Sequence, residues 1–295
     1  MKILILLKKW EGGVGSVVKY IQKEFEKKGH EVKVISREDD LGTKSLLRSI
    51  FPLRSIVKRL MKEEGFDVIY AQDWSLAFPF LFPWKIFKER LYGVFYGNNP
   101  PATFFIQTHV GKALGKNLIV CNDVLNKRFP ASTLIYNRVD HNTFKPSKKV
   151  KRVAGSVGFS NWKTDEYSFN AIKTAVEKCG KNLVIAEGIP KEKMPEFYRT
   201  LEYFISLPPK HAGFGLVYLE AMASNVPKII GSNYGGGSVL PITKIEDFGD
   251  ISKAIDGAKK KDYREWILKN NFTWENAVKE LLEIFSHSGD TKDAI

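Results

Sequence analysis

Cysteine and histidine are scarce in this 295-residue chain, and neither is spaced for metal binding. The two cysteines, Cys121 and Cys179, fit no metal or redox spacing, which favours an intracellular protein. The five histidines are scattered, and the chain has neither His-x3-His nor Asp-x-Asp. The sequence therefore predicts no metal site and no bound cofactor.

Long apolar runs are also missing. No stretch of about 18 uncharged apolar residues occurs, so no membrane-spanning helix is expected. The start, MKILILLKKWEGG, has only a short apolar run after one lysine, too short for the core of a signal peptide. These absences predict a cytoplasmic protein and leave peripheral membrane association open.

Acidic residues are outnumbered, with 33 Asp and Glu against 46 Lys and Arg and a formal net charge of +13. Such an excess favours an anionic partner such as a phosphate, an acidic lipid surface or nucleic acid. It is equally typical of the Lys- and Glu-rich surfaces of heat-adapted proteins. Because basic residues alternate with acidic ones and no nucleic-acid motif is present, a nucleic-acid partner is disfavoured.

What the chain does contain is a regular alternation of buried strands and helices. KILILL at 2–7 is continuously apolar, as expected of a strand buried on both faces of a parallel sheet. A helix over 16–29 follows, with Ser16 as its expected N-cap and Gly29 at its end. The alternation restarts after 141–152, a basic stretch broken by Pro146. We therefore predict an α/β fold of two Rossmann-like, doubly wound domains, over 1–147 and 148–272, and a last segment at 273–295.

Two glycine clusters are candidates for anion binding. Gly12-Gly13-Val14-Gly15 lies between the first strand and the first helix, where backbone can approach a phosphate. Val18 occupies the position of a third glycine, which disfavours a dinucleotide-binding dehydrogenase, and a tight turn without ligand is the alternative. Gly235–Gly237 is either an anion-binding nest or a mobile loop.

Glu220 is the one formally charged side chain between Lys210 and Lys228, within an apolar helix. An unpartnered charge in such surroundings is costly, so a bonding partner is expected. A carboxylate accepts two hydrogen bonds side by side and suits a vicinal diol such as a ribose. The alternative is a structural glutamate bonded to backbone. Gly213 and Gly215 just upstream allow close backbone approach at the helix start.

Two stretches raise the question of a membrane. In PLRSIVKRLMKEEG an apolar stripe lies opposite a basic one, as in a helix on an anionic membrane or in an ordinary surface helix. SLAFPFLFPWKIF at 75–87 either lines a greasy acceptor site or is a core segment. The apolar stripe of the first stretch is Leu53, Ile56, Val57, Leu60 and Met61, and the basic one is Arg54, Lys58, Arg59 and Lys62.

Five segments together resemble the GT-B retaining glycosyltransferases of the family 4, group 1 type. They are GGVGSVVKYIQKEFEKKGHEVKVIS, DVIYAQDW, TLIYNRVDHNTFKP, GFGLVYLEAMASNVPKIIGSNYGG and FTWENAV. The resemblance implies two domains facing a cleft, the first on the acceptor side and the second binding a nucleotide sugar, with a closing helix in 273–295 that returns to the first. It also implies a metal-independent hexosyl transfer from a nucleoside-diphosphate sugar to an acceptor hydroxyl, with retention. The acceptor class, whether glycan, lipid or small molecule, is not implied.

The resemblance also assigns residues. It implies that Glu220 binds the ribose and that Gly13 and Gly15 approach the diphosphate. Lys163 is expected to offset diphosphate charge, and Tyr96 and His211 to contact the sugar. The remaining residues implied at the nucleotide are Gly213, Phe214, Gly215 and Leu216.

Three positions depart from the family pattern. Ala212 stands where the first of two glutamates is usual, Phe159 where an arginine follows Gly158, and Tyr96 where a histidine is usual. Loss of an arginine removes a charge and a bidentate donor. These departures keep a second hypothesis open, a non-catalytic relative that binds a nucleotide or a carbohydrate.

Overall fold

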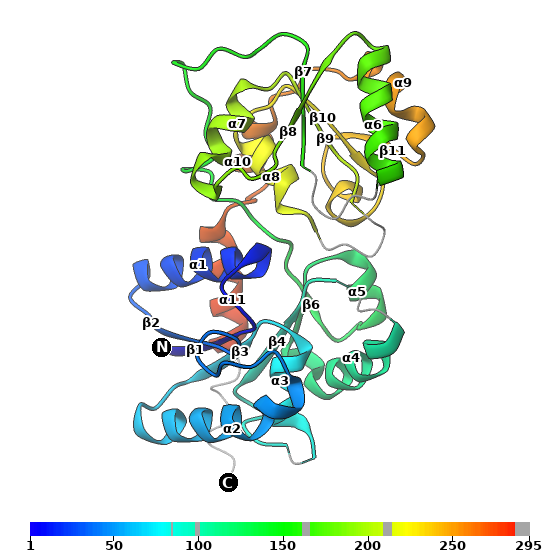
Figure 1. Cartoon of the computed structure of the whole chain (residues 1–295). Coiled ribbons are helices and arrows are strands. Elements are labelled where there is room, and N and C mark those ends of the chain that lie inside the picture. The colour runs from blue at the N-terminus through cyan, green and yellow to red at the C-terminus, as the bar shows by residue number, and fades with distance from the viewer. Residues whose placement is uncertain (84, 98–100, 161–165, 209–213, 287–295) are drawn as a thin grey trace. The chain divides into compact units, whose positions relative to one another are not determined.

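The computed structural model describes residues 1–286 except 84, 98–100, 161–165 and 209–213. Contacts divide the chain into unit 1, Met1–Asn137 with Trp274–Ile295, and unit 2, Arg138–Thr273. Each unit holds a parallel sheet wrapped by helices (Figure 1). The predicted α/β class with two Rossmann-like units is confirmed.

The sheet of unit 1 is built, within the described residues, from β1 Lys2–Leu7, β2 Glu31–Ser36, β3 Val68–Ala71, β4 Leu91–Phe95, β5 Leu118–Val120 and β6 Thr133–Leu134. The strands pair in parallel in the order β2-β1-β3-β4-β5-β6. Residues 3–7 of β1 are fully buried, as the continuous apolar run predicts for a strand covered on both faces.

The helices of unit 1 are α1 Gly12–Lys27, α2 Leu46–Glu63, α3 Trp74–Leu81, α4 Pro101–Leu114, α5 Asp123–Arg128 and α11 Trp274–Ser286, with a 3₁₀ turn at Gly115–Asn117. α1 packs against α11 on one face of the sheet, and α2, α3 and α4 form the layer on the other face (Figure 1). α11 is anchored in the core by Phe285, whose ring lies 5.4 Å from that of Tyr70 and 4.7 Å from that of Tyr92. The last described segment is thus part of the first unit.

α1 begins four residues earlier than expected. Ser16 is not its N-cap but lies inside the helix, where its hydroxyl donates to the carbonyl of Gly12 at 3.0 Å. Glu11 occupies the N-cap position, and its side chain makes no capping bond. Gly13 and Gly15, which looked like loop residues, lie within the helix, whereas Gly12, its first residue, has φ of +87°, outside the right-handed helical region. Gly29 follows the helix end with φ of +81°, as its place in the sequence indicates.

Of the two hypotheses for residues 75–87, the core segment is correct for the part that forms α3. Leu76, Ala77, Phe80 and Leu81 are at most 1% exposed and belong to the core under the sheet. No apolar acceptor site is therefore available on these side chains.

The sheet of unit 2 is built, within the described residues, from β7 Ser156–Phe159, β8 Asn182–Ile185, β9 Tyr203–Ser206, β10 Lys228–Ser232 and β11 Thr243–Ile245. Its parallel order is β11-β10-β9-β7-β8. The helices are α6 Glu166–Lys178, α7 Met194–Thr200, α8 Leu216–Ala223, α9 Ile251–Gly257 and α10 Tyr263–Lys269, with 3₁₀ turns at Lys191–Lys193, Gly235–Ser238 and Phe248–Asp250. α6 and α9 pack on one face, and α7, α8 and α10 gather on the other (Figure 1).

Arginines fix the stretch 138–152 to unit 2. Arg152 donates to the carbonyls of Leu201 at 2.8 Å and Asn225 at 2.6 Å, and burial lowers its pKa. Arg199 donates to the carbonyl of Lys145 at 2.6 Å. Contacts divide the chain after residues 137 and 273, whereas the sequence predicts boundaries after residues 147 and 272.

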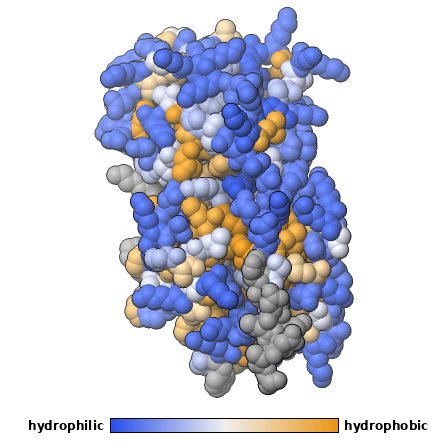
Figure 2. Space-filling model, turned by 180° about the vertical axis from the view of Figure 1, so that it is seen from behind, coloured by the Kyte–Doolittle hydropathy of each residue, from blue (hydrophilic) through white to orange (hydrophobic). Residues whose placement is uncertain are grey.

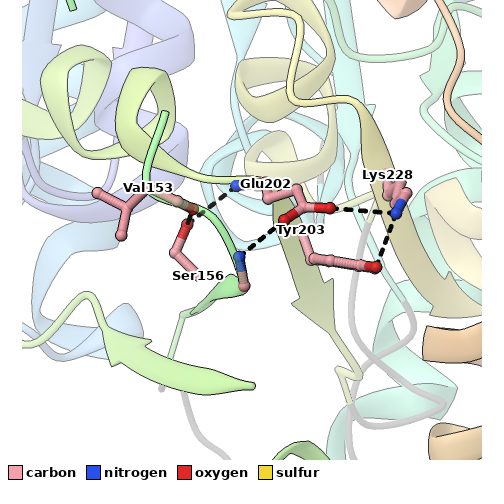
Figure 3. A network of polar contacts seen from close by, with 6 residues as sticks. Val153, Ser156, Glu202, Tyr203 and Lys228 are labelled. Atoms are coloured by element: carbon pink, nitrogen blue, oxygen red, sulfur yellow. Dashed lines mark hydrogen bonds and ion pairs between the residues drawn. The ribbon is translucent and has the colours of Figure 1, made fainter. Parts of the chain in front are cut away.

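A polar network ties together the amino ends of the central strands of unit 2 (Figure 3). The carboxylate of Glu202 accepts from the backbone N–H of Gly155 at 2.7 Å and from Lys228 Nζ at 3.1 Å. Lys228 also donates to the hydroxyl of Tyr203 at 2.7 Å. The Gly155 N–H bond lowers the pKa of Glu202, and the bonds to Tyr203 and Glu202 raise that of Lys228. Both groups are therefore held in their charged forms.

Most of the face drawn in Figure 2 is hydrophilic, with apolar residues gathered in patches between polar ones. Among the described residues, no helix is both long and apolar enough to cross a membrane.

We predict that Glu202→Gln lowers the free energy of unfolding by about 1–2 kcal/mol at pH 7, because charge-assisted hydrogen bonds are lost. Since the pKa of Glu202 is lowered in the folded state, its contribution is complete above the unfolded pKa of about 4.3 and is lost as pH falls through the folded value. Urea denaturation at pH 7 and near pH 4 measures this. Glu187→Gln, at an exposed glutamate of the same unit, is the control. Equal effects of the two substitutions at pH 7 would contradict the prediction.

Candidate functional site

A cavity of about 330 Å³ opens in unit 1 where β1, β3 and β4 end and α1 begins. It lies at a topological switch point, because the strands next to β1 are β2 and β3, reached by helices on opposite faces. Ligands of open α/β sheets bind in such crevices at the carboxyl ends of the strands. The cavity is lined by Leu7, Lys8, Lys9, Glu11, Gly12, Gly13, Val14, Gln72, Asp73, Phe95, Tyr96, Gly97 and Gln107.

The start of α1 meets this cavity with unused backbone donors. The first N–H groups of a helix have no intrahelical partner, and neither a side-chain cap nor an acidic residue occupies the first turn of α1. A Cβ atom added at Gly12 or Gly13 would meet nothing within 4 Å, so the approach to these N–H groups is open. Together with the positive end of the helix dipole, this arrangement suits an anion.

The two glycines predicted at the diphosphate, Gly13 and Gly15, differ in their surroundings. Gly13 is exposed and lines the cavity. Gly15 is buried, and a Cβ there would lie 1.9 Å from the carbonyl oxygen of Trp10. Packing against Trp10 is therefore sufficient to require glycine at position 15. At position 13 the protein leaves room for a side chain, so a requirement for glycine there could come only from a bound ligand.

Tyr96 lies at the end of β4 with its hydroxyl inside unit 1. It donates to Gln72 Oε1 at 2.6 Å. Burial, together with Tyr70, Cys121 and Asp73 nearby, raises the pKa of Tyr96 well above its ordinary value. The phenol therefore stays neutral and can act only as a hydrogen-bonding group at neutral pH.

Gln72 is a cavity residue that the sequence reasoning did not single out. It is 1% exposed, and its Nε2 makes no hydrogen bond of good geometry among the described residues, although the side chain interacts with the nearby Tyr70 hydroxyl. A buried donor that is only weakly satisfied is costly, which makes this amide a candidate ligand contact. The available signal was the position of Gln72 and Asp73 directly after a buried strand.

Two neighbouring side chains hold the cavity wall. Asp73 accepts from the N–H of Ser75 at 2.9 Å and thereby caps α3. Gln107 donates to the carbonyl of Gly97 at 3.0 Å and accepts from Arg128 at 3.1 Å.

In unit 2, Glu220 extends from α8, a helix that begins beyond the carboxyl end of β9. Its Oε2 accepts from the hydroxyl of Tyr198 at 3.0 Å, and no donor contacts Oε1 among the described residues. The sequence predicts a bonding partner for the Glu220 carboxylate. For its Oε2 atom that partner is the Tyr198 hydroxyl and not a backbone group. The half-buried carboxylate keeps one oxygen available for a ligand.

Burial dominates the electrostatics of this carboxylate. It raises the pKa of Glu220, while the bond from Tyr198 and the charge of Lys191 lower it. Tyr198 is fully buried between Phe144, Phe197 and Phe204, and burial next to Glu220 raises its own pKa well above the ordinary value. Tyr198 therefore remains a neutral donor that favours the ionised form of Glu220. Sequence reasoning missed it because it lies 22 residues upstream on another helix.

Phe214, just before α8, packs against the second glycine cluster. A Cβ at Gly236 would lie 2.0 Å from the carbonyl oxygen of Phe214, and one at Gly237 would lie 2.0 Å from that of Ser232. Gly236 and Gly237 are buried in the 3₁₀ turn Gly235–Ser238, where packing requires glycine, whereas Gly235 is half-buried with φ of +58°. Gly215 is the N-cap residue of α8 and has φ of +76°, a backbone conformation that favours glycine.

The structure describes some of the remaining residues that were predicted to contact the nucleotide or the sugar. Leu216 is the first residue of α8 and is half-buried. Phe159, at the usual arginine position, is fully buried in β7 against Phe169, so no basic group faces a ligand there. The predicted contacts Lys163, His211 and Gly213, and the departure at Ala212, lie outside the described residues. Within the described residues, no three His, Cys, Asp or Glu side chains cluster as metal ligands would.

Comparison with known proteins gives matches at the level of structure. No protein-family model and no curated protein sequence matches the chain. Sucrose-phosphate synthase from Thermosynechococcus elongatus matches with a TM-score of 0.71 at 14% identity, covering 97% of this chain and 98% of that one.

Two further solved structures extend the likeness. HepE of Anabaena in complex with UDP-glucose matches with a TM-score of 0.68 at 15% identity over 97% of this chain and 100% of that one. An α,α-trehalose-phosphate synthase (UDP-forming) from Burkholderia vietnamiensis gives 0.64 at 10% identity over 100% and 99%. The chain therefore has the GT-B glycosyltransferase fold, and these structural neighbours are glycosyltransferases.

We predict that Gly13→Ala and Gly15→Ala have opposite consequences. Gly15→Ala forces a methyl group onto the Trp10 carbonyl and should destabilise the protein by about 2–3 kcal/mol. Gly13→Ala meets open space and should leave stability within about 1 kcal/mol, or raise it, because alanine favours helix. Thermal or urea unfolding of the two variants measures this. Equal destabilisation by both would rule out the open approach at Gly13.

Proposed function

We propose that the protein transfers a sugar from a nucleoside-diphosphate sugar to an acceptor hydroxyl, with retention and without a metal. The observation that carries this proposal is Glu220, a carboxylate with one oxygen held by Tyr198 and the other without a donor among the described residues. Such a group is ready to accept from a vicinal diol. The proposal is supported by the resemblance around GFGLVYLEAMAS and by the GT-B fold, which HepE, solved with UDP-glucose, shares.

The proposed roles follow the resemblance. Glu220 binds the ribose hydroxyls of the donor. Gly13 and Gly15 lie at its diphosphate, together with the positive charge of Lys163. Tyr96 and His211 contact the transferred sugar. The residues proposed around the nucleotide are Gly213, Phe214, Gly215 and Leu216.

The chemistry proposed is electrostatic. As the bond between the anomeric carbon and the diphosphate breaks, the electron pair leaves with the diphosphate. The acceptor hydroxyl oxygen forms the new bond to that carbon, and its proton passes to an oxygen of the departing diphosphate. Fixed donors directed at the developing charge usually supply the largest catalytic term. The free N–H groups at the start of α1 are donors of this kind. Tyr96, neutral at working pH, contributes a hydrogen bond and not a proton.

The second candidate function is nucleotide or carbohydrate binding without catalysis. Its support is Phe159, whose ring is fully buried at the position where a basic side chain is usual. Transfer would then lack one charge that neutralises the departing diphosphate. A relative that binds a nucleotide without catalysis would differ from the transferase in turnover.

We predict that one of UDP, GDP and ADP binds the wild type and that Glu220→Ala weakens this binding at least tenfold, about 1.4 kcal/mol. The reason is the loss of the acceptor for the ribose hydroxyls. Isothermal titration calorimetry measures it. The control is Glu187→Gln, which changes an exposed carboxylate in the same unit. If none of the three nucleotides binds, Glu220 is structural and the proposed function is wrong.

A panel of nucleotide sugars of the base identified in that titration then separates transfer from binding. Release of the nucleoside diphosphate, with and without EDTA, reports both turnover and metal dependence. Turnover unaffected by EDTA is expected. Tight nucleotide binding with no turnover of any donor would favour the non-catalytic alternative.

We predict that Tyr198→Phe shifts the pH dependence of nucleotide affinity upward. Ionised Glu220 binds the ribose, so affinity falls as pH drops through the pKa of Glu220. The Tyr198 hydroxyl lowers that pKa, and its removal should move the fall in affinity to higher pH. Calorimetry from pH 5 to 8 measures the shift. Tyr263→Phe is the control, because Tyr263 is a buried tyrosine of unit 2 whose hydroxyl makes no hydrogen bond to Glu220 among the described residues. A uniform loss of affinity at every pH would show only a structural role for Tyr198.

A further inference from the structure

The two helical layers of unit 1 carry different charge. α1 and α11, on one face of the sheet, contain four basic and five acidic residues. α2 and α4, in the layer on the other face, contain six basic residues and one acidic residue. Among these four helices, the excess of basic residues therefore lies on the α2 and α4 side.

The apolar stripe expected on α2 is not available to a membrane. Leu53, Val57 and Leu60 are buried in the core beneath the helix. Arg54, expected on the basic stripe, is half-buried and donates to the carbonyls of Pro79 and Phe82, which fastens α2 to α3. The sequence hypothesis of a membrane-lying stripe is therefore wrong for these residues.

The opposite side of α2 exposes a different apolar pair. Leu47 is 75% exposed and Phe51 is 76% exposed. They lie four residues apart, so their side chains are neighbours on the helix surface. Large apolar side chains that folding leaves in water, beside one another, are typical of an interaction surface.

Cations surround this pair. Lys58 and Lys62 follow Leu47 and Phe51 at helical spacing, and Arg48 and Arg59 lie beside them. All four are exposed, and none forms a salt bridge with a carboxylate among the described residues. The basic–apolar face of α2 thus consists of Leu47, Arg48, Phe51, Lys58, Arg59 and Lys62.

We propose that the basic–apolar face of α2 binds the surface of an anionic lipid bilayer. Leu47 and Phe51 enter the boundary between headgroups and acyl chains, and the four cations lie near lipid phosphates. Anionic lipid fits both components of the face. Nucleic acid would satisfy the cations and leave the apolar pair in water, so the pair favours lipid. This association is independent of the sugar transfer proposed above.

The test uses the full chain and sedimentation with vesicles of phosphatidylcholine alone or of phosphatidylcholine with about 30 mol% phosphatidylglycerol, whose headgroup is anionic. The wild type should bind only the anionic vesicles and should dissociate as salt is raised. The double variant Leu47→Ser with Phe51→Ser should lower the partition coefficient for anionic vesicles at least tenfold. The double variant Lys58→Gln with Lys62→Gln should lower it by a similar factor. Melting temperatures of all variants verify folding.

Two matched controls locate the effect. Lys23→Gln with Lys279→Gln removes the same charge from the exposed surface of α1 and α11. Tyr167→Ser with Leu268→Ser removes exposed apolar groups from unit 2. Both controls should bind vesicles as the wild type does.

Three outcomes would overturn the proposal. The first is a wild type that ignores anionic vesicles at low salt. The second is equal weakening by both charge pairs, which would mean that net charge alone attracts the protein. The third is salt-sensitive binding to random duplex DNA that Lys58→Gln with Lys62→Gln weakens while vesicle binding is unaffected, which would assign the face to nucleic acid.

Discussion

Both sheets are parallel and carry helices on each face, so the side chains of their central strands have no route to water. β1, β3 and β4 in unit 1 and β7 and β9 in unit 2 are buried almost throughout. Polar chemistry is thereby confined to strand ends and to the helix starts beside them. At the carboxyl edges lie the cavity of unit 1 and the helix that carries Glu220. At the amino edge of unit 2 the same constraint produces a network in which every charge has a protein partner, as Glu202 and Lys228 show.

Glu220 and Glu202 illustrate how burial decides between structure and function. Glu202 is satisfied by a backbone N–H and a lysine, and its pKa is lowered. Glu220 receives one neutral hydroxyl, and burial raises its pKa. A carboxylate left partly unsatisfied in this way keeps binding capacity that a fully bonded one has already used. The difference in bonding, and not the residue type, separates the candidate ligand group from the structural one.

Much of the fold was predictable because its signals are local. Continuous apolar runs identify the strands, and Gly29 identifies a helix end. The start of α1 was misjudged because Ser16 is a good N-cap residue in isolation, whereas glycines can also adopt the first helical turn. Contacts between residues far apart in the sequence could not be predicted from local patterns. Two examples are the hydrogen bond from Tyr198 to Glu220 and the close approach of the Trp10 carbonyl to Gly15 but not to Gly13. Periodicity predicted that α2 is amphipathic, but only burial shows that the apolar stripe faces the core.

Unit 1 is assembled from both ends of the chain, with unit 2 inserted between them. During synthesis, Tyr70 and Tyr92 leave the ribosome long before Phe285, the residue whose ring packs on both. Unit 2, continuous in sequence, can complete its core in that interval, whereas unit 1 keeps an apolar sheet face partly uncovered until α11 arrives. The nascent chain is therefore most exposed to aggregation and to chaperone capture on the α1 side of its first sheet, and a ribosome stalled before residue 274 would hold it in that state.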